Sequence, residues 1–419
     1  MTETMAMSMT DRALRVAFFP DCYDEIDGVA NTSRQFESFA LRRRLPFLTV
    51  HGGTNNEIQK LGSTLRVTRR RGRFGFPVDK KHDFDLAFWR HLDVVESMVR
   101  EFDPDILHIT GPSDVGQLGV AIAHRLRIPL AASWHTNVHQ YLEQRAAALL
   151  FFLPRVVRER LGAAIREGTL LATLRFYHIA QVLFAPNREL IEVIAKGTGK
   201  PCHPMHRGVD TELFDPRRRD RADNTFVIGF VGRLTVEKNI RDLVTLEQNL
   251  IQAGLTDFRF LIVGQGAEEP WLRANMQHAD FTGVLRGEAL ARAYANMDVF
   301  AFPSQTDTYG NVVLEALASG VPAVVTDGGG PRFIVRPGET GLVARDLPEF
   351  CTCIQNLARH PAQRENMRAA ARTQAMTASW DAVFDSVYAG YEHGLRAGAR
   401  AGKRIRMRPG AEMAVSNLG

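Results

Sequence analysis

The stretch DVFAFPSQTDTYGNVVLEALASGVPAVV (residues 298–325) decides the fold of this chain, because it holds two apolar strands, a loop and a helix in close succession. Its first five residues are a strand that a proline ends, and its last three are a second strand. Between the strands, an Ala- and Leu-rich run that starts at Asn311 predicts a short helix, which Gly320 ends. The loop before Asn311 therefore leads from the end of a strand to the N-terminus of a helix.

This helix N-terminus favours a bound anion, because its first amides lack intrahelical partners and the positive end of the helix dipole lies there. The amides that we expect to hold a distal phosphate and sugar hydroxyls are those of Tyr309, Gly310, Asn311 and Val312. Two carboxylates flank the terminus, where they would repel a phosphate but accept hydrogen bonds from hydroxyl groups. We expect Asp307 to accept from a sugar hydroxyl and Glu315 from a ribose diol, so the combination predicts a nucleotide-sugar site.

The segment resembles the carboxylate-x7-carboxylate signature of family-four retaining glycosyltransferases with the GT-B fold. Its wording, TDTYGNVVLEA (residues 306–316), is most similar to the branch of GDP-mannose-dependent α-mannosyltransferases and sulfoquinovosyl-lipid synthases. The family usually has Glu at the first carboxylate, whereas Asp307 keeps the charge and shortens the reach by one methylene. Without the resemblance, an ordinary α/β unit with a solvated loop also fits these residues.

Composition limits the class of protein. The chain has 419 residues, 45% of them hydrophobic and 24% charged, which is typical of a globular protein and long enough for two domains. No run approaches the roughly 20 apolar residues of a membrane-spanning helix, and the start lacks the apolar centre of a signal peptide. The four cysteines lack zinc spacing, so we expect reduced thiols in a cytoplasmic protein. A net charge of +5 suits an anionic membrane surface, an anionic substrate or nucleic acid.

Strands and helices alternate along the chain, which is typical of doubly wound α/β sheets. The resemblance extends from Leu14 to Glu392 and implies two Rossmann-like domains that face each other across a cleft, with a C-terminal helix that crosses back to the first. The predicted units are an acceptor-binding domain (1–203, completed by 379–395), a donor-binding domain (204–378) and a basic tail (396–419).

Two residues of the first domain are candidates for the site. Gly28 lies between a strand and a helix, where a glycine lets the backbone approach a ligand. The resemblance places it beside the donor phosphates, and a plain turn glycine fits equally well. His135 ends a buried strand at the same sheet edge, and WHTN (134–137) followed by Tyr141 is similar to the acceptor-side histidine motif of the family. The resemblance implies that His135 reaches the donor sugar, although a lone histidine is more often structural.

The donor diphosphate has two candidate cations. Arg233 and Lys238 follow the end of an apolar strand and lie on a loop that enters a helix. Fixed cations there would stabilise a departing diphosphate, whose negative charge grows as the glycosidic bond breaks. The string GRLTVEKN (232–239) is highly similar to the donor-phosphate motif of the family. The turn around Val284 resembles the turn at which backbone groups contact the nucleobase.

Two further segments keep more than one interpretation. Arginines and phenylalanines cluster just after a predicted strand, at Arg69, Arg70, Arg71, Arg73, Phe74 and Phe76. They are either solvated charge or a membrane-surface patch, and no nucleic-acid-binding motif accompanies them. Apolar and basic residues mix at helical spacing over residues 146–178, as in helices that lie in a membrane interface, in a core-facing helix pair or along an acceptor groove.

The function predicted is retaining transfer of a hexose, with mannose favoured, from GDP-mannose or a UDP-hexose to a hydroxyl of a lipid or glycan acceptor. Because Arg233 and Lys238 would neutralise the diphosphate, we expect neither a metal nor a cofactor. We expect a cytoplasmic protein, with an anionic membrane surface as a further partner at the inner face of the membrane and no nucleic acid. One alternative is a catalytically silent module that binds nucleotide-sugars or glycans. A nicotinamide oxidoreductase is disfavoured, because GQG (264–266) lacks the third glycine of that fingerprint.

Overall fold

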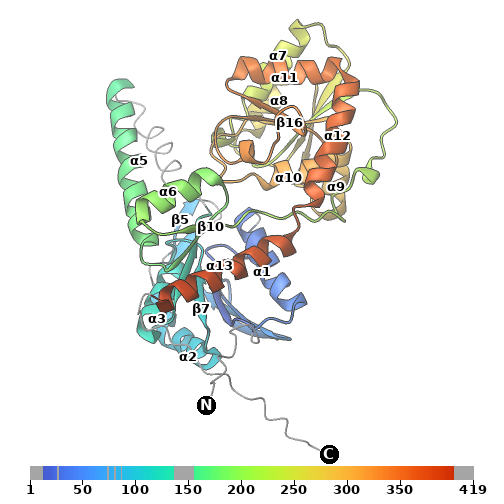
Figure 1. The fold of residues 1–419 in the computed structure, drawn as a ribbon. Helices are drawn as coiled ribbons and strands as arrows, with labels where there is room; N and C mark the ends of the chain where they lie inside the picture. Colours follow the sequence, from blue (N-terminus) through green and yellow to red (C-terminus); the bar gives the residue numbers. More distant parts are fainter. Residues whose placement is uncertain are drawn as a thin grey trace, which may run out of the picture.

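The computed structural model describes residues 13–25, 28–72, 75–79, 82–85, 87–135 and 155–400. Two α/β units lie one above the other, each built on its own mainly parallel sheet (Figure 1). Most strands are continuous apolar runs with both faces buried, as VAFF in the first strand and FVIGFV in β11 (Phe226–Val231) illustrate. Such runs are typical of parallel strands that helices cover on both faces.

In the part of the chain that the structure describes, the first sheet has eight strands in the order β10-β9-β8-β7-β1-β2-β4-β3. Its strands are β1 Val16–Phe19, β2 Phe47–Gly53, β3 Glu57–Leu61, β4 Thr64–Arg70, β7 Ile106–Ile109, β8 Leu130–Ser133, β9 Val182–Ala185 and β10 Cys202–Pro204. All neighbouring pairs are parallel except β3 and β4, and β5 (Gly75–Asp79) pairs with β6 (His82–Asp85) as a separate hairpin. The strand order reverses between β1 and β7, and such a switch point is where open α/β sheets bind ligands.

Among its described residues, the helices of the first unit are α1 Gly28–Arg42, α2 Leu92–Phe102, α3 Asp114–Leu126, α5 Arg155–Tyr177 and α6 Arg188–Thr198. The side chain of Asn187 caps the N-terminus of α6, because it accepts a hydrogen bond from the Leu190 amide at 2.9 Å. Ser113 caps α3 in the same way, through the amide of Gly116.

The second sheet has six parallel strands in the order β13-β12-β11-β14-β15-β16, and its switch point lies between β11 and β14. Besides β11, its strands are β12 Phe258–Val263, β13 Ala279–Gly283, β14 Val299–Phe302, β15 Ala323–Thr326 and β16 Gly341–Ala344. Its helices are α7 Asp242–Gln252, α8 Glu269–Asn275, α9 Gly287–Ala295, α10 Asn311–Ala318, α11 Leu347–Arg359 and α12 Pro361–Met376. The strand, loop, helix and strand predicted for residues 298–325 are therefore all present.

The last helix, α13 (Trp380–Arg400), crosses from the second unit onto the first sheet, as predicted (Figure 1). Phe384 stacks on Phe36 of α1 with ring centroids 4.5 Å apart, and Tyr391 lies in the same fully buried cluster. The first sheet ends with β10, so the predicted domain boundary between residues 203 and 204 falls within this strand. The basic tail lies outside the described residues from position 401 onward.

The arginine cluster after β4 is only partly on the surface. Arg69 is buried, and Arg71 is mostly buried in an ion pair with Asp114 at 3.2 Å, so these two side chains do not contribute to an exposed patch. Arg70 is exposed, whereas Arg73, Phe74 and the side chain of Phe76 lie outside the described part.

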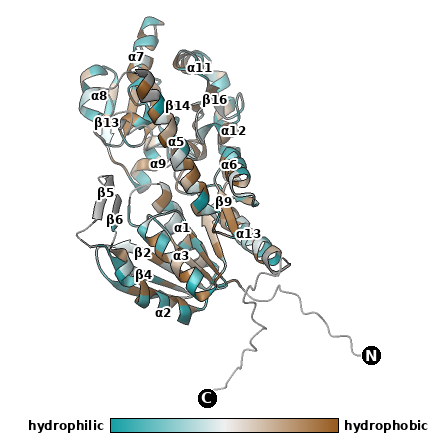
Figure 2. Ribbon diagram, turned by 90° about the vertical axis from the view of Figure 1, so that its left-hand side faces the viewer, coloured by the Kyte–Doolittle hydropathy of each residue, from teal (hydrophilic) through white to brown (hydrophobic). Residues whose placement is uncertain are grey.

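Helix α5 differs along its length. Its C-terminal turns pack on the first core through Leu174 and Tyr177, whereas Val157, Leu161 and Leu171 are exposed. Figure 2 shows hydrophilic and hydrophobic residues mixed along this helix. No helix among the described residues is long and apolar enough to cross a membrane. Of the interpretations for residues 146–178, a core-facing helix describes only the end of α5, and residues 146–154 lie outside the described part.

Candidate active site

The loops that follow β11 and β14 meet at the switch point of the second sheet and bring three predicted residues together. Arg233 and Lys238 come from the first loop, and Asp307 comes from the second. The Lys238 Nζ lies 2.6 and 2.7 Å from the two carboxylate oxygens of Asp307. Ser304 also donates a hydrogen bond to this carboxylate at 2.5 Å. The sequence predicted both charged groups for the donor site, but not that they would pair.

The pair keeps Asp307 ionised. Burial alone would raise the pKa of this carboxyl group, but the charge of Lys238 and its hydrogen bonds hold the pKa below its ordinary value. Asp307 is therefore a hydrogen-bond acceptor at neutral pH, which is what a contact to a sugar hydroxyl requires. Lys238 is held in place by the carboxylate, with 13% of its side chain exposed.

Arg233 is more open than Lys238. Its side chain is 44% exposed, and its guanidinium lies 3.7 Å from the Glu237 carboxylate on the same loop. An arginine in this position can turn toward an anion and bind two of its oxygens at once. One cation of the predicted pair is therefore fixed, and the other is accessible.

Helix α10 presents its N-terminus to the same region. Gly310 precedes it with a φ of 101°, a left-handed conformation that favours glycine, and no described side chain caps the helix. The side chain of Pro331 lies 3.0 Å from where a Cβ on Gly310 would be. The predicted donor amides of Tyr309, Gly310, Asn311 and Val312 lie on or beside this terminus, which has the geometry of an anion site.

Glu315 lies in the second turn of α10 and is half-buried. Tyr294 donates a hydrogen bond to its Oε2 at 2.9 Å. Burial raises the pKa of Glu315 to about 7, and the bond from Tyr294 offsets only part of that rise. Near neutral pH the group therefore exchanges between an acceptor-only carboxylate and a carboxylic acid that can also donate.

A tight turn supports the loop of Asp307 from behind. The Gly330 amide donates to the carbonyl of Asp307 at 2.6 Å, and a Cβ on Gly330 would lie 2.1 Å from the Thr308 carbonyl oxygen. Only glycine fits at that distance. Residues 328–330 were not predicted to belong to the site, although three consecutive glycines before a proline were a signal for such close packing.

Residues of the first unit meet the donor loop directly. The Thr308 hydroxyl donates to the carbonyl of His135 at 2.8 Å, and Asn187 donates to the carbonyl of Thr308 at 2.6 Å. Asn311 Nδ2 lies 3.4 Å from the carbonyl of Gly28. The structure therefore places His135 and Gly28 beside the donor loop, as expected for residues of one site.

The ring of His135 is engaged on both sides. Its Nδ1 lies 2.9 Å from a guanidinium nitrogen of Arg207, and its Nε2 lies 2.5 Å from the Ser133 hydroxyl. A sugar hydroxyl would have to share or replace one of these bonds, so the role of the His135 ring toward the donor stays a prediction. Neither Arg207 nor Ser133 was predicted as a site residue from the sequence. Tyr141 lies outside the described residues.

The remaining predicted residue, Val284, follows β13 with its side chain 44% exposed. The Gly264 amide donates to the Gly283 carbonyl at 2.8 Å, which fixes the turn before Val284 at the carboxyl edge of the sheet. Its contact with a nucleobase stays a prediction. Among the described residues, no group of three or more His, Cys, Asp or Glu side chains could hold a metal ion.

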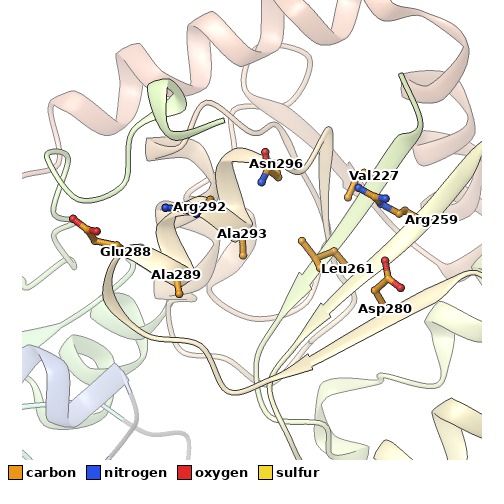
Figure 3. Close-up of a pocket in the computed structure, with 9 residues that line it drawn as sticks. All are labelled: Val227, Arg259, Leu261, Asp280, Glu288, Ala289, Arg292, Ala293 and Asn296. Carbon is orange, nitrogen blue, oxygen red and sulfur yellow. The ribbon is translucent and has the colours of Figure 1, made fainter. Parts of the chain in front are cut away.

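Two cavities lie away from the charged pair. One of about 570 Å³ is an open pocket lined by β11, β12, β13 and α9. Its lining residues Val227 and Arg259 lie near the starts of their strands, opposite the edge where the site residues gather (Figure 3). Another of about 230 Å³ lies between the two connections that join the units, with Arg207, Tyr309 and Ser379 in its lining. Neither contains Arg233, Lys238 or Asp307.

Comparison with known proteins adds to this geometry. Residues 40–213 match the model described as Glycosyltransferase Family 4, and residues 225–360 match the model described as Glycosyl transferases group 1. A GDP-mannose-dependent α-mannosyltransferase of Mycobacterium tuberculosis is 34% identical over 343 residues, which cover 79% of this chain and 83% of that protein. The chain belongs to the family-four glycosyltransferases.

Further relatives of this glycosyltransferase carry related names. A GDP-mannose-dependent α-mannosyltransferase of Mycolicibacterium smegmatis is 36% identical over 59% of this chain and 62% of that protein. A sulfoquinovosyl transferase of Arabidopsis thaliana is 28% identical over 85% and 69%. Among solved structures, sucrose-phosphate synthase from Thermosynechococcus elongatus superposes with a TM-score of 0.68 at 16% identity, over 92% of this chain and all of that one. The GT-B fold predicted from the sequence is confirmed.

Proposed function

We propose that this glycosyltransferase moves a hexose, with mannose favoured, from a nucleotide diphosphate to a hydroxyl of a lipid or glycan acceptor with retention at the anomeric carbon. The observation that carries the proposal is the Lys238–Asp307 pair, which lies with the uncapped N-terminus of α10 at the switch point of the second sheet. Positive charge, amide donors and a carboxylate acceptor are there in one place, which is the set that a nucleotide-sugar needs.

Each group of residues would have its own role in the reaction. Arg233, Lys238 and the α10 amides would stabilise the leaving diphosphate, whose charge increases in the transition state more than in the bound donor. Asp307 would hold a sugar hydroxyl, and Glu315 would hold the ribose diol. Because Arg233 and Lys238 would both meet the diphosphate, we propose that the reaction needs no divalent metal.

GDP-mannose is favoured over UDP-hexoses by the relatives. Three GDP-mannose-dependent α-mannosyltransferases are 36%, 34% and 32% identical to this chain. We expect backbone groups of the exposed turn at Val284 to contact the base, so side chains there would not select guanine by themselves. A lipid acceptor is supported by the exposed apolar residues of α5 and by the basic balance of the chain, which suit peripheral binding to an anionic membrane from the cytoplasm.

The test is donor hydrolysis without acceptor. The protein is incubated with GDP-mannose, UDP-glucose and UDP-galactose, with and without EDTA, and release of the nucleoside diphosphate is measured. We expect the fastest turnover with GDP-mannose, no effect of EDTA, and the α-anomer as the first sugar product by NMR. Inversion at the anomeric carbon would overturn the retaining assignment, and loss of activity in EDTA would overturn metal independence.

Arg233→Ala supplies the residue-level test, and Arg359→Ala is its control, because Arg359 is also an exposed arginine of the second unit but lies at the end of α11. We expect hydrolysis to fall about 100-fold in Arg233→Ala, as for the loss of one charged contact to the transition state, and to stay unchanged in Arg359→Ala. If no donor turns over in the unmodified protein, with or without liposomes, a nucleotide-sugar-binding module without catalysis replaces the proposal.

Vesicle binding tests the membrane part separately. Cosedimentation with anionic vesicles should decrease with added salt, because exposed charges are screened over about 10 Å at 0.1 M salt. Cosedimentation that ignores ionic strength would refute an electrostatic attachment.

A further inference from the structure

A chain of buried polar side chains connects the reaction centre to the crossing helix. It runs from Arg207 through His135, Ser133 and His108 to Tyr391 on α13. The Arg207 Nη2 lies 2.9 Å from His135 Nδ1, the His135 Nε2 lies 2.5 Å from Ser133 Oγ, and Ser133 Oγ lies 2.8 Å from His108 Nε2. The Tyr391 hydroxyl contacts His108 Nδ1. All five side chains are at most 4% exposed, so water does not compete for these bonds.

The direction of donation along this chain is determined at one end. A guanidinium can only donate, so Arg207 forces His135 Nδ1 to be the acceptor and leaves the proton on Nε2. That N–H donates to Ser133, whose own hydroxyl proton then points to His108 Nε2. His108 must therefore carry its proton on Nδ1 and donate it to the hydroxyl of Tyr391. Arg207 thus selects the tautomer of both histidines.

Both histidines stay neutral over the working pH range. Burial lowers the pKa of His108 to about 3. Burial and the nearby charge of Arg207 lower the pKa of His135 well below its ordinary value. Burial also lowers the pKa of Arg207, to about 10, which leaves this guanidinium charged at neutral pH. The hydrogen bonds therefore determine which ring nitrogen of each histidine carries the proton, and both rings stay uncharged.

The reaction centre is tied to the same chain through the backbone. The carbonyl of His135 accepts from Thr308, which is next to Asp307 in the donor loop. Arg207 itself belongs to the segment that joins the two units, where its carbonyl oxygen lies 3.5 Å from the hydroxyl of Tyr309. Hydrogen bonds therefore connect His135 to the donor loop, to the interdomain segment and to α13.

We propose that Arg207 and Tyr391 are positioning residues that hold His135 in one orientation and one tautomer at the reaction centre. The kinetic part of this inference rests on the proposed function, whereas the tautomers can be measured without any turnover. The crossing helix α13 then supports the active site, because the hydroxyl of its Tyr391 is the last group in this series of hydrogen bonds, at the end opposite to Arg207.

The first test reads the tautomers by ¹⁵N NMR of the histidine rings in the full chain. We expect His135 protonated at Nε2 and His108 at Nδ1 in the unmodified protein. Arg207→Met removes the donor but keeps a similar stem, and should move the His135 proton to Nδ1 and the His108 proton to Nε2. Arg207→Lys retains a donor and should keep the original pattern. Unchanged tautomers in Arg207→Met would overturn the proposal.

The second test uses variants that each remove one hydroxyl from this series of hydrogen bonds, at positions other than Arg207. Tyr391→Phe removes the final hydroxyl, and Tyr388→Phe is a matched control on the same helix, because the buried Tyr388 hydroxyl has no hydrogen-bond partner in the part of the chain that the structure describes. We expect kcat for donor hydrolysis to fall about ten-fold in Tyr391→Phe and in Ser133→Ala, as for the loss of one buried hydrogen bond, with little change in KM. Tyr388→Phe should match the unmodified protein.

The two tests separate failure of this inference from failure of the proposed function. Equal kcat values for Tyr391→Phe and Tyr388→Phe would show that the hydroxyl of Tyr391 does not act on the reaction, which overturns its positioning role. If the unmodified protein turns over no donor, the proposed function fails. The NMR tautomers in Arg207→Met and Tyr391→Phe then decide on their own whether the hydrogen-bonded side chains determine the tautomer of His135.

Discussion

Breaking the Lys238–Asp307 pair should destabilise the protein in a pH-dependent way. At 2.6 Å and an effective dielectric constant of about 20, the two charges attract by about 6 kcal/mol. Desolvation offsets much of this, and removal of one partner from a buried pair costs about 3–5 kcal/mol, chiefly because the other charge is left unpaired. The carboxylate is 21% exposed, so we expect the lower end, about 3 kcal/mol, for Lys238→Met at neutral pH.

The sign of the pH dependence follows from Asp307. In the unmodified protein its pKa is below the ordinary value, so the pair stabilises the fold at neutral pH, and this contribution is lost as pH falls through the lowered pKa. In Lys238→Met the effect of burial remains without its main counter-charge, so we expect the pKa of Asp307 to rise above its ordinary value. The deficit should therefore be largest at neutral pH and shrink as pH falls, because the carboxyl group then takes up a proton.

The assay is urea denaturation of Lys238→Met, Asp307→Asn and the double variant at about pH 7 and pH 4.5. In the double variant neither charge is left unpaired, so it should be more stable than Lys238→Met at neutral pH, with a coupling free energy of about 2 kcal/mol. The reasoning is refuted if Lys238→Met shows the same deficit at both pH values, or if the double variant is destabilised by the sum of the two single changes.

Three other changes probe separate parts of the site. Burial raises the pKa of Glu315 to about 7, so its ionised fraction falls below that pH, and KM for the donor should rise as pH falls; Glu315→Gln should lose this dependence. Gly330→Ala places a Cβ 2.1 Å from the Thr308 carbonyl oxygen and should destabilise the protein by about 1–3 kcal/mol in urea denaturation. Gly338→Ala is the control: its Cβ meets no atom within 4 Å, so it should lower the free energy of unfolding less, although the φ of Gly338 is positive. Thr308→Val removes the hydroxyl that donates to the His135 carbonyl and should lower kcat/KM about ten-fold, whereas Thr308→Ser should retain most of it.

The sequence predicted the parts of the site that are encoded by short-range patterns. A buried strand followed by a charged or polar loop puts that loop at the carboxyl edge of a parallel sheet, so the order of residues alone places Arg233, Lys238 and Asp307 at one edge. The helix start at Asn311 was readable from local composition in the same way. None of these predictions requires knowledge of which side chain faces which.

Contacts between distant parts of the chain were not predictable. His108 and Tyr391 are 283 residues apart, and only the crossing of α13 over the first sheet brings them together. Likewise, the sequence alone indicates that Arg71 is a surface charge. In the structure its side chain is mostly buried in an ion pair with Asp114 at the start of α3. A pattern of hydrophobic and polar residues assigns a face of a strand or helix, whereas the identity of the partner across that face depends on the tertiary arrangement.

The pairing of Lys238 with Asp307 is consistent with roles for both in binding a donor. Each is a mostly buried charge, and either one without a partner would be costly in the absence of ligand. On the proposed function, a bound nucleotide-sugar offers phosphate oxygens to the lysine and a hydroxyl to the carboxylate, so the pair can loosen without leaving a charge unsatisfied. Donor binding should then raise stability less in Lys238→Met/Asp307→Asn than in the unmodified protein, because the double variant offers neither group to the ligand.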